Sequence, residues 1–232
     1  MTLTHSLTNV VAFVEDQLAR YGMRGVCVVW FGGEPLLQPQ FFDIIAAVHA
    51  HGVFVFEINT NGRFLTAQVL ARISSFGFKP EMKISFDGLG FHDWMRGCGG
   101  AEQDALRAIK LCVDVGFPTR VQMNINRKNR DSILPSLALL DDMGVGRARV
   151  IPTTPSTRWE MNAQGQSMEW GEFFHNNWPN RFTRALAPWK CIKHDYSGAV
   201  GMVFSGHYSA ALIGCRTTVF SFSEAHFRGS DR

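Results

Sequence analysis

The sequence predicts an α/β fold, a partial (β/α) TIM-like barrel in which helices cover a parallel sheet. Three observations support this class. Short apolar runs alternate with amphipathic stretches of helical period over the first two-thirds of the 232 residues. Each strand-and-helix unit takes about 25 to 30 residues, the size of a crossover between parallel strands. Polar and glycine-rich clusters follow the apolar runs, where the strands would end.

The elements follow from the period of the apolar residues. A helix is expected first, because Leu7, Val11, Val14 and Leu18 recur at helical spacing. The strands that follow are short and apolar throughout, which is typical of a sheet that helices cover. The expected strands are 26–31, 53–58, 82–86, 119–125 and 147–151. The expected helices are 4–21, 38–51, 66–75, 101–115 and 131–143.

The positions of the unusual residues favour a barrel over a doubly wound sheet. In a barrel several strand ends converge on one site, whereas an open sheet concentrates functional residues at one switch point. Here every expected strand has such a cluster at its carboxyl end. The clusters are Gly32-Gly33-Glu34-Pro35, Asn59-Thr60-Asn61-Gly62, Ser85-Phe86-Asp87-Gly88, Asn124-Ile125-Asn126 and Pro152-Thr153-Thr154.

The chain changes character after the fifth expected strand. We expect residues 1–155 to form the barrel and 156–189, rich in Pro, Trp and Asn, to form a linker with a helix at 167–176. Residues 190–232 are expected to form a small extension with a β-hairpin, whose strands 199–204 and 208–213 flank a glycine turn.

Composition excludes several classes of protein. With 46% hydrophobic and 19% charged residues, the chain is typical of a soluble globular protein. A net charge of +3 indicates no nucleic-acid partner, and no apolar run reaches the roughly 20 residues that span a bilayer. Five scattered cysteines without a CxxC pair fit a reducing compartment, so we expect a cytoplasmic protein. Cys27 and Cys112 fall within apolar patterns and are expected to pack in the core.

The loop after the first strand has the features of a ligand site. Gly32 and Gly33 allow a ligand to approach the backbone closely, and Glu34 offers an anionic acceptor for an ammonium group. The alternative is a tight turn with an exposed glutamate. Ser85 and Asp87 alternate along the third strand, so both could point to one ligand, a ribose or a carboxylate-bearing group. The alternative there is a local turn at Asp87.

The loop that follows the third strand contains three further candidates. Arg96 could bind a carboxylate through its forked guanidinium, although a loop arginine can equally be solvated. His92 could be a ligand or general acid, or it could make a local hydrogen bond beside Asp93. Asparagines at the strand ends would line the barrel mouth, or simply form turns. They are Asn59, Asn61, Asn124 and Asn126.

These landmarks, taken in order, resemble the radical S-adenosylmethionine (radical SAM) superfamily. The segments WFGGEPLL, NTNG and ISFDG, then His92-Asp93 and Arg96-Gly97, are similar to its peptide- and sulfatase-maturing branch with a SPASM or twitch extension. The resemblance covers residues 4–155.

The resemblance implies roles for several residues and partners. Gly32, Gly33 and Glu34 would contact the methionine amino group of S-adenosylmethionine, Ser85 would hydrogen-bond this cofactor, and Arg96 would pair with its carboxylate. It further implies a [4Fe-4S] cluster, a peptide or protein substrate, and a reducing partner such as flavodoxin or ferredoxin for the intact form.

The chain departs from this family in its cysteines. The family holds its cluster with a CxxxCxxC loop upstream of the GGE strand, and this sequence contains no such motif. We therefore expect an N-terminally truncated enzyme, inactive as written, through a misplaced start codon or gene decay. A missing first strand would also leave an open edge beside strand 26–31 and lower the solubility.

Two further cysteines and two alternative functions stay open. Cys191 and Cys215 flank the expected hairpin and resemble auxiliary-cluster ligands of a SPASM or twitch module, or they are unpaired thiols. One alternative is a non-catalytic partial barrel that binds a nucleotide-like ligand or a peptide. The other is a metal-free enzyme that uses Asp87 and His92 as acid and base.

Overall fold

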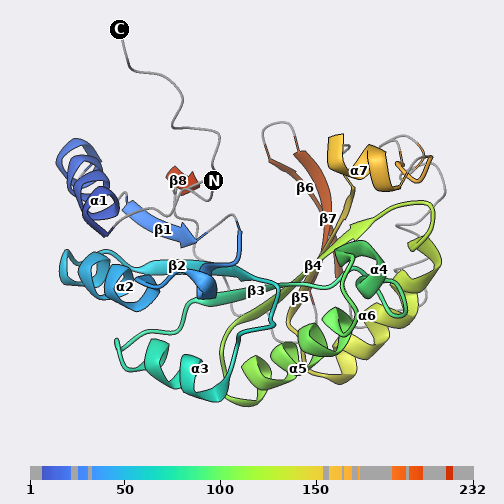
Figure 1. Cartoon of the computed structure of the whole chain (residues 1–232), viewed down its shortest axis with the longest axis horizontal. Helices are drawn as coiled ribbons and strands as arrows, with labels where there is room; N and C mark the ends of the chain where they lie inside the picture. Colours follow the sequence, from blue (N-terminus) through green and yellow to red (C-terminus); the bar gives the residue numbers. More distant parts are fainter. Residues whose placement is uncertain are drawn as a thin grey trace, which may run out of the picture.

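The centre of the molecule is one eight-stranded sheet with the order β6-β7-β5-β4-β3-β2-β1-β8 (Figure 1). The computed structural model describes residues 7–21, 26–30, 33–153, 157–163, 165–168, 172, 190–196, 199–205 and 218–221. The sheet curls into an open, partial barrel, as predicted. Its strands are β1 (Val26–Trp30), β2 (Val55–Thr60), β3 (Glu81–Ser85), β4 (Thr119–Ile125), β5 (Arg147–Pro152), β6 (Lys190–Tyr196), β7 (Ala199–Ser205) and β8 (Thr218–Ser221).

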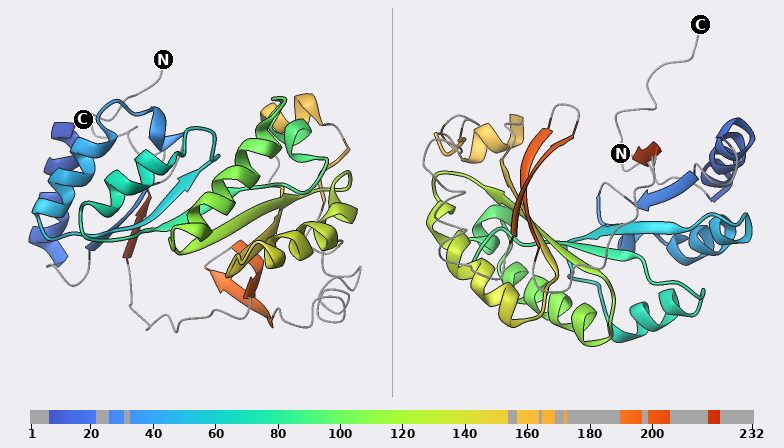
Figure 2. Two further views of the ribbon diagram at one scale, coloured as in Figure 1. Left: turned by 90° about the horizontal axis from the view of Figure 1, so that it is seen from below. Right: turned by 180° about the vertical axis from the view of Figure 1, so that it is seen from behind.

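Strands β1 to β5 run parallel and neighbour one another in chain order. The helices between them lie on the outer side of the sheet (Figure 2). This is the crossover arrangement that the alternating pattern predicted, and the predicted bounds are correct to within a few residues. The described helices are α1 (Leu7–Tyr21), η2 (Pro35–Leu37), α2 (Phe41–Ala50), α3 (Ala67–Ser74), α4 (His92–Arg96), α5 (Ala101–Asp114), η3 (Arg130–Ser132), α6 (Ile133–Asp142) and α7 (Thr157–Asn162).

The core fills the space between the sheet and these helices. Alternate residues of β2, β3 and β4, such as Ile58, Met82 and Val121, are fully buried against the helices. Cys112 on α5 belongs to the same core, as predicted, and burial raises the pKa of its thiol to about 12. None of the described helices is long and apolar enough to cross a membrane.

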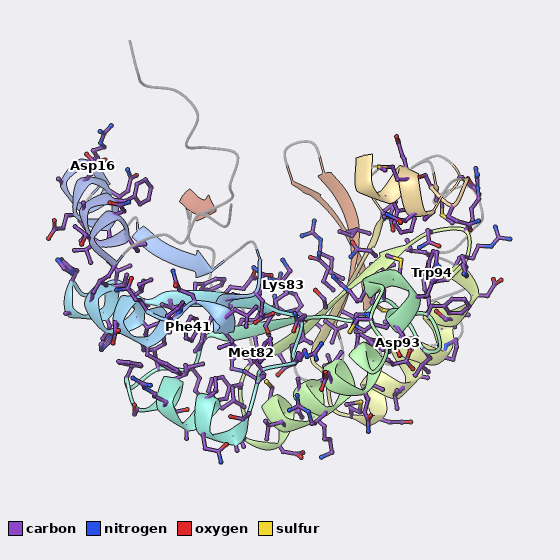
Figure 3. All side chains as sticks on the ribbon, viewed as in Figure 1. Asp16, Phe41, Met82, Lys83, Asp93 and Trp94 are labelled. Atoms are coloured by element: carbon purple, nitrogen blue, oxygen red, sulfur yellow. The ribbon has the colours of Figure 1, made fainter. Side chains whose placement is uncertain are left out.

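The inner face of the sheet differs from the expectation. The strands were predicted to be apolar throughout, but charged residues of β2 to β5 alternate with the core residues and share the concave side. Lys83 lies on that side and its neighbour Met82 on the helix side (Figure 3). The concave charged set consists of Glu57, Glu81, Lys83, Arg120, Arg147 and Arg149.

The C-terminal region joins the same sheet at both edges. A hairpin forms, but between β6 and β7: β7 pairs antiparallel with β6 on one side and with β5 on the other. Residues 208–213 and most of the predicted helix 167–176 lie outside the described residues. The division at 155 and 189 stays a prediction.

The predicted open edge beside β1 is wrong. β8 lies along β1 in parallel, with Val26 paired to Thr218 and Val29 to Ser221. Strand β1 therefore has hydrogen-bonded neighbours on both sides, and the reason given for low solubility does not hold.

Candidate functional site

The loop after β1 is tied to the end of β2 through Glu34. One carboxylate oxygen accepts hydrogen bonds from the Thr60 hydroxyl at 2.8 Å and the Leu36 amide at 3.3 Å, and the other accepts from the Asn61 amide at 2.8 Å. Burial raises the pKa of Glu34, and these hydrogen bonds oppose that rise. The predicted alternative is correct in part: Glu34 caps the short helix η2 in a tight turn after β1, but its side chain is half-buried rather than exposed.

Gly33, beside Glu34, has a φ of +58°, a conformation that favours glycine. A side chain added there would meet nothing within 4 Å, so the backbone of this loop faces open space. Gly32 lies outside the described residues. The part of the GGE element that the structure describes thus combines an accessible backbone with a fixed carboxylate.

Asp87 is the centre of a second network, at the end of β3. Its side chain is fully buried, and one oxygen lies 2.9 Å from the Arg96 guanidinium and 3.2 Å from His92 Nδ1. The other oxygen accepts from the Asn124 amide at 2.9 Å and the Asn124 side chain at 3.1 Å. Burial acts to raise the pKa of Asp87, but the hydrogen bond with His92 and the charge of Arg96 outweigh it, so the pKa lies below its usual value.

This network places Asp87 and His92 inside the protein rather than in contact with a ligand. His92 is 1% exposed, and its Nδ1 also lies 2.9 Å from the Asp87 amide nitrogen. His92 does not pair with the adjacent Asp93, which instead accepts hydrogen bonds from the amides of Gly100 and Glu102 at the start of α5. With both side chains buried, an acid and base pair of Asp87 and His92 has no access to a substrate.

Arg96 differs from its partner because its side chain is 33% exposed. Asp87 contacts one guanidinium nitrogen, and a guanidinium has five N–H donors, so donors remain for a second carboxylate. Such an arrangement presents a forked cation in a fixed orientation.

The remaining strand-end residues mostly hold loops in place. The Asn129 side chain donates to the carbonyls of Asp87 and Asn124 at 2.8 Å each. The Asn126 side-chain oxygen accepts from the Lys128 and Asn129 amides, which is the turn that the alternative reading of the asparagines predicted. Sequence reasoning missed Asn129 because one partner, Asp87, follows β3 and the other, Asn124, lies in β4, so the contact depends on how the two strands are placed.

Ser85, the last residue of β3, is half-buried and shares the concave side with Lys83. By register it lies beside Gln122 of β4. No ion pair or side-chain hydrogen bond of Ser85 is found among the described residues, so its hydroxyl can serve a ligand at the strand end.

The cysteines do not form a cluster site in the part of the chain that the structure describes. Cys112 is enclosed in the core, and Cys98 is half-buried with its sulfur 3.5 Å from Arg63 Nη1. Cys191 lies in β6 with its side chain outside the described residues, and Cys215 lies outside them altogether. No group of three or more His, Cys, Asp or Glu that could hold a metal ion occurs among the described residues. These residues therefore do not fit a [4Fe-4S] cluster, which requires convergent thiolates.

Fold and site together define a class: a partial parallel barrel with a polar site at the carboxyl ends of its strands. The model of the radical SAM superfamily matches residues 5–140, which is more than half of the chain. The chain belongs to the radical SAM superfamily, whose members are enzymes that use S-adenosylmethionine with an iron–sulfur cluster.

Relatives of several activities resemble it. An AdoMet-dependent heme synthase of Methanosarcina barkeri is 25% identical over 162 residues, 69% of this chain and 45% of that protein. The mycofactocin maturase MftC of Mycobacterium tuberculosis is 29% identical over 58% of this chain and 32% of its own length. The chain thus spans less than half of either relative.

A solved structure confirms the fold. The structure of anSMEcpe with bound AdoMet and the Kp18Cys peptide matches with a TM-score of 0.59 at 15% identity, covering 79% of this chain and 56% of that one. At this level of identity the likeness shows the barrel fold alone.

Proposed function

We propose that this chain binds S-adenosylmethionine across the carboxyl ends of β1 to β4, as part of an enzyme that modifies a peptide or protein. The methionine ammonium would lie over Gly33 and Glu34, the methionine carboxylate on Arg96, and Ser85 would hydrogen-bond the cofactor. Gly32 belongs to the same proposal from its sequence position.

The observation that carries the proposal is the guanidinium of Arg96. A buried carboxylate fixes it while a third of the side chain stays exposed, at the same strand-end edge as Glu34. A fixed anion and a fixed cation at one edge suit the two charges of an amino acid. The membership in the superfamily makes S-adenosylmethionine the expected zwitterion.

The cysteines of this chain bear on whether it can hold the iron–sulfur cluster of the superfamily. In this superfamily a reduced [4Fe-4S] cluster supplies the electron that cleaves S-adenosylmethionine, and a flavodoxin or ferredoxin is the reductant expected for the intact form. The sequence has no CxxxCxxC, and Cys191 with Cys215 supplies at most two thiolates. We infer that a chain with these five cysteines binds S-adenosylmethionine without cleaving it reductively.

The peptide substrate is proposed from the relatives. MftC is named a maturase, and anSMEcpe was solved with a peptide. A non-catalytic barrel that binds a nucleotide-like ligand or a peptide is the alternative.

Calorimetric titration with S-adenosylmethionine tests the binding site. The wild type should bind, and R96K should bind about tenfold or more weakly, because lysine keeps the charge beside Asp87 but loses the fork. E34Q should weaken binding to a similar degree. Arg20 forms an exposed ion pair with Asp16 on α1 and provides the control, since R20K should leave the affinity unchanged. Equal affinities in all four proteins would overturn the proposed site.

Anaerobic reconstitution with iron and sulfide tests the inference about the cluster. The expected result is no 5′-deoxyadenosine after addition of dithionite and S-adenosylmethionine. Formation of 5′-deoxyadenosine by this chain would contradict it, whatever the titration shows.

A further inference from the structure

The concave charged set carries more positive than negative charge. Its six members come from four adjacent parallel strands, β2 to β5, and comprise four cations and two carboxylates. Charged residues rarely line the inside of a sheet without pairing, because removing a charge from water is costly. The pairing of each member therefore shows where the excess positive charge lies.

Both carboxylates form ion pairs with Lys83, Arg120 and Arg147, which lie nearer the amino ends of the strands than Arg149 does. Arg120 contacts Glu57 and lies 3.1 Å from Glu81. Arg147 pairs with Glu81, and Lys83 Nζ lies 3.5 Å from Glu57. Three of the four cations therefore have a carboxylate partner on the same face.

Arg149 is different. It lies two residues after Arg147 on the same strand and so on the same face, and it is half-buried. It has no ion pair with any carboxylate among the described side chains. Within the described part of the chain, the member of the set without a carboxylate partner is therefore the one nearest the carboxyl ends of the strands.

The register connects Arg149 to the proposed cofactor site. Arg149 pairs with Gln122 of β4, and Gln122 pairs with Ser85 of β3. The three residues form one row across the concave face, and two strand spacings amount to about 10 Å. The distance between Arg149 and Ser85 is thus short enough for one small molecule to reach both residues.

The pKa of Lys83 shows the effect of the positive charge of Arg149 on a neighbouring residue. Burial, and after it the charge of Arg149, lower the pKa of Lys83 to about 8, against the opposing effect of Glu81. An anion bound at Arg149 would relieve this repulsion, so both cations favour the same ligand charge.

We propose that Arg149 binds a carboxylate of the substrate on the concave face of the sheet, in the same row as Ser85. This specificity-determining role rests on the proposed function, because it places the substrate beside bound S-adenosylmethionine. A planar guanidinium matches the geometry of a carboxylate. A peptide and a heme differ in shape, but both carry carboxylates, so the proposal covers the two kinds of compound that the relatives' names indicate.

Matched acid and amide probes test the proposal. The first pair is a fluorescein-labelled hexapeptide with three glutamates and the same peptide with three glutamines. The second is coproporphyrin III, a porphyrin tetracarboxylate, and its tetramethyl ester. Inorganic phosphate, added as a competitor, reports whether the site takes any oxyanion. Binding is measured on wild type, R149M, R149K and the control R72M. Arg72 lies on the outer helix α3, with its guanidinium over the ring of Phe42 on α2.

The wild type should bind at least one acidic probe about tenfold or more tightly than its neutral counterpart. R149M should remove most of this preference, R149K should retain part of it, and R72M should retain it fully. Loss of the preference in R149M together with unchanged binding of S-adenosylmethionine supports the proposal. If submillimolar inorganic phosphate displaces the acidic probes, the site is a phosphate site, and the proposed carboxylate ligand is overturned.

Other outcomes also decide. If wild type shows no preference for either acidic probe, or if R149M keeps the preference, the proposal is overturned even though S-adenosylmethionine binds. If the acidic preference depends on Arg149 but S-adenosylmethionine does not bind, the proposed function fails and the anion site stands. Circular dichroism shows whether R149M and R149K fold. If R149M does not fold, R149K provides the test.

Discussion

At the scale of single residues, Gly88 shows how tightly the end of β3 packs. It follows Asp87 directly, has a φ of +103°, and an added Cβ would lie 2.2 Å from the Ser132 hydroxyl oxygen. Gly90 also has a positive φ, +76°, but an added Cβ there would meet nothing within 4 Å. The two glycines therefore separate backbone strain from steric overlap.

We expect G88A to lower the free energy of unfolding by about 2 to 4 kcal/mol, from strain and overlap together. G90A should cost about 1 kcal/mol, from strain alone. Urea denaturation of both variants gives the difference. Equal losses would show that the Ser132 side chain moves away without cost.

Glu34 predicts a pH dependence of cofactor binding. Its pKa in the free protein is raised by burial, and a bound ammonium would favour the charged carboxylate and lower the pKa. Below the free-protein pKa, binding must release a proton, so the affinity for S-adenosylmethionine should fall as the pH falls from 7 to 5. Titrations across this range should show the fall in wild type and a much flatter profile in E34Q. A flat wild-type profile would place the ammonium elsewhere.

At the scale of elements, β8 has a role that can be measured. It pairs in parallel with β1 and covers the edge of the strand that leads to Gly33 and Glu34. Deletion of residues 218–232 should expose that edge, lower the midpoint of thermal unfolding and increase aggregation. Circular dichroism during heating measures the midpoint, and light scattering measures the aggregation. Deletion of residues 222–232 keeps β8 and is the control; if the two truncated chains behave alike, β8 does not protect the edge.

The sequence predicted the five parallel strands and most helices because each of these elements has a local signal, an apolar run or a helical period. It did not predict β6 as the partner of β7, nor β8, because sheet edges are chosen by contacts between segments far apart in the chain. Helices α4 and α7 were missed for a simpler reason: segment 92–96, predicted to be part of a loop, and segment 157–162 have only five and six residues, too few to show a period.

Part of the candidate site was predictable because its residues also lie in local sequence motifs. The order of Glu34, Ser85 and Arg96 along the chain indicated a cofactor site at the strand ends. The sequence could not show that Asp87 is enclosed and holds Arg96, since that depends on the loop after β3 folding back over the strand end. The signal for Arg149 was present, as charged residues at alternate positions of the strands. Only the ion pairs across strands show which cation has no carboxylate partner among the side chains that the structure describes.

At the scale of the whole molecule, the buried charges of the concave face make stability depend on pH. The pKa of Lys83 is about 8 in the folded protein and near 10.5 when the chain is unfolded, because burial disfavours its charged form. Between these two values the unfolded chain binds more protons than the folded protein, so the free energy of unfolding rises with pH across this window. The limit is about 3 kcal/mol, from 1.36 kcal/mol for each pKa unit.

Urea denaturation at pH values from 7.5 to 10 measures this rise. K83M removes the titrating group and should show a smaller slope in the same window, while Glu57 keeps Arg120 as a partner. The exposed Lys110, which pairs with Asp114 on α5, provides the control, and K110M should keep the wild-type slope. Parallel curves for wild type and K83M would exclude Lys83 as the source.

The pairing of β8 with β1 also bears on how the protein is made. Val26 and Thr218 are neighbours in the sheet but lie about 190 residues apart in the sequence. On the ribosome, β1 emerges about 190 residues before its outer neighbour, and synthesis proceeds at roughly 5 to 20 residues per second. During that interval, on the order of ten seconds or more, the GGE strand has an open edge, which makes the nascent chain a candidate client for chaperones that bind exposed strands.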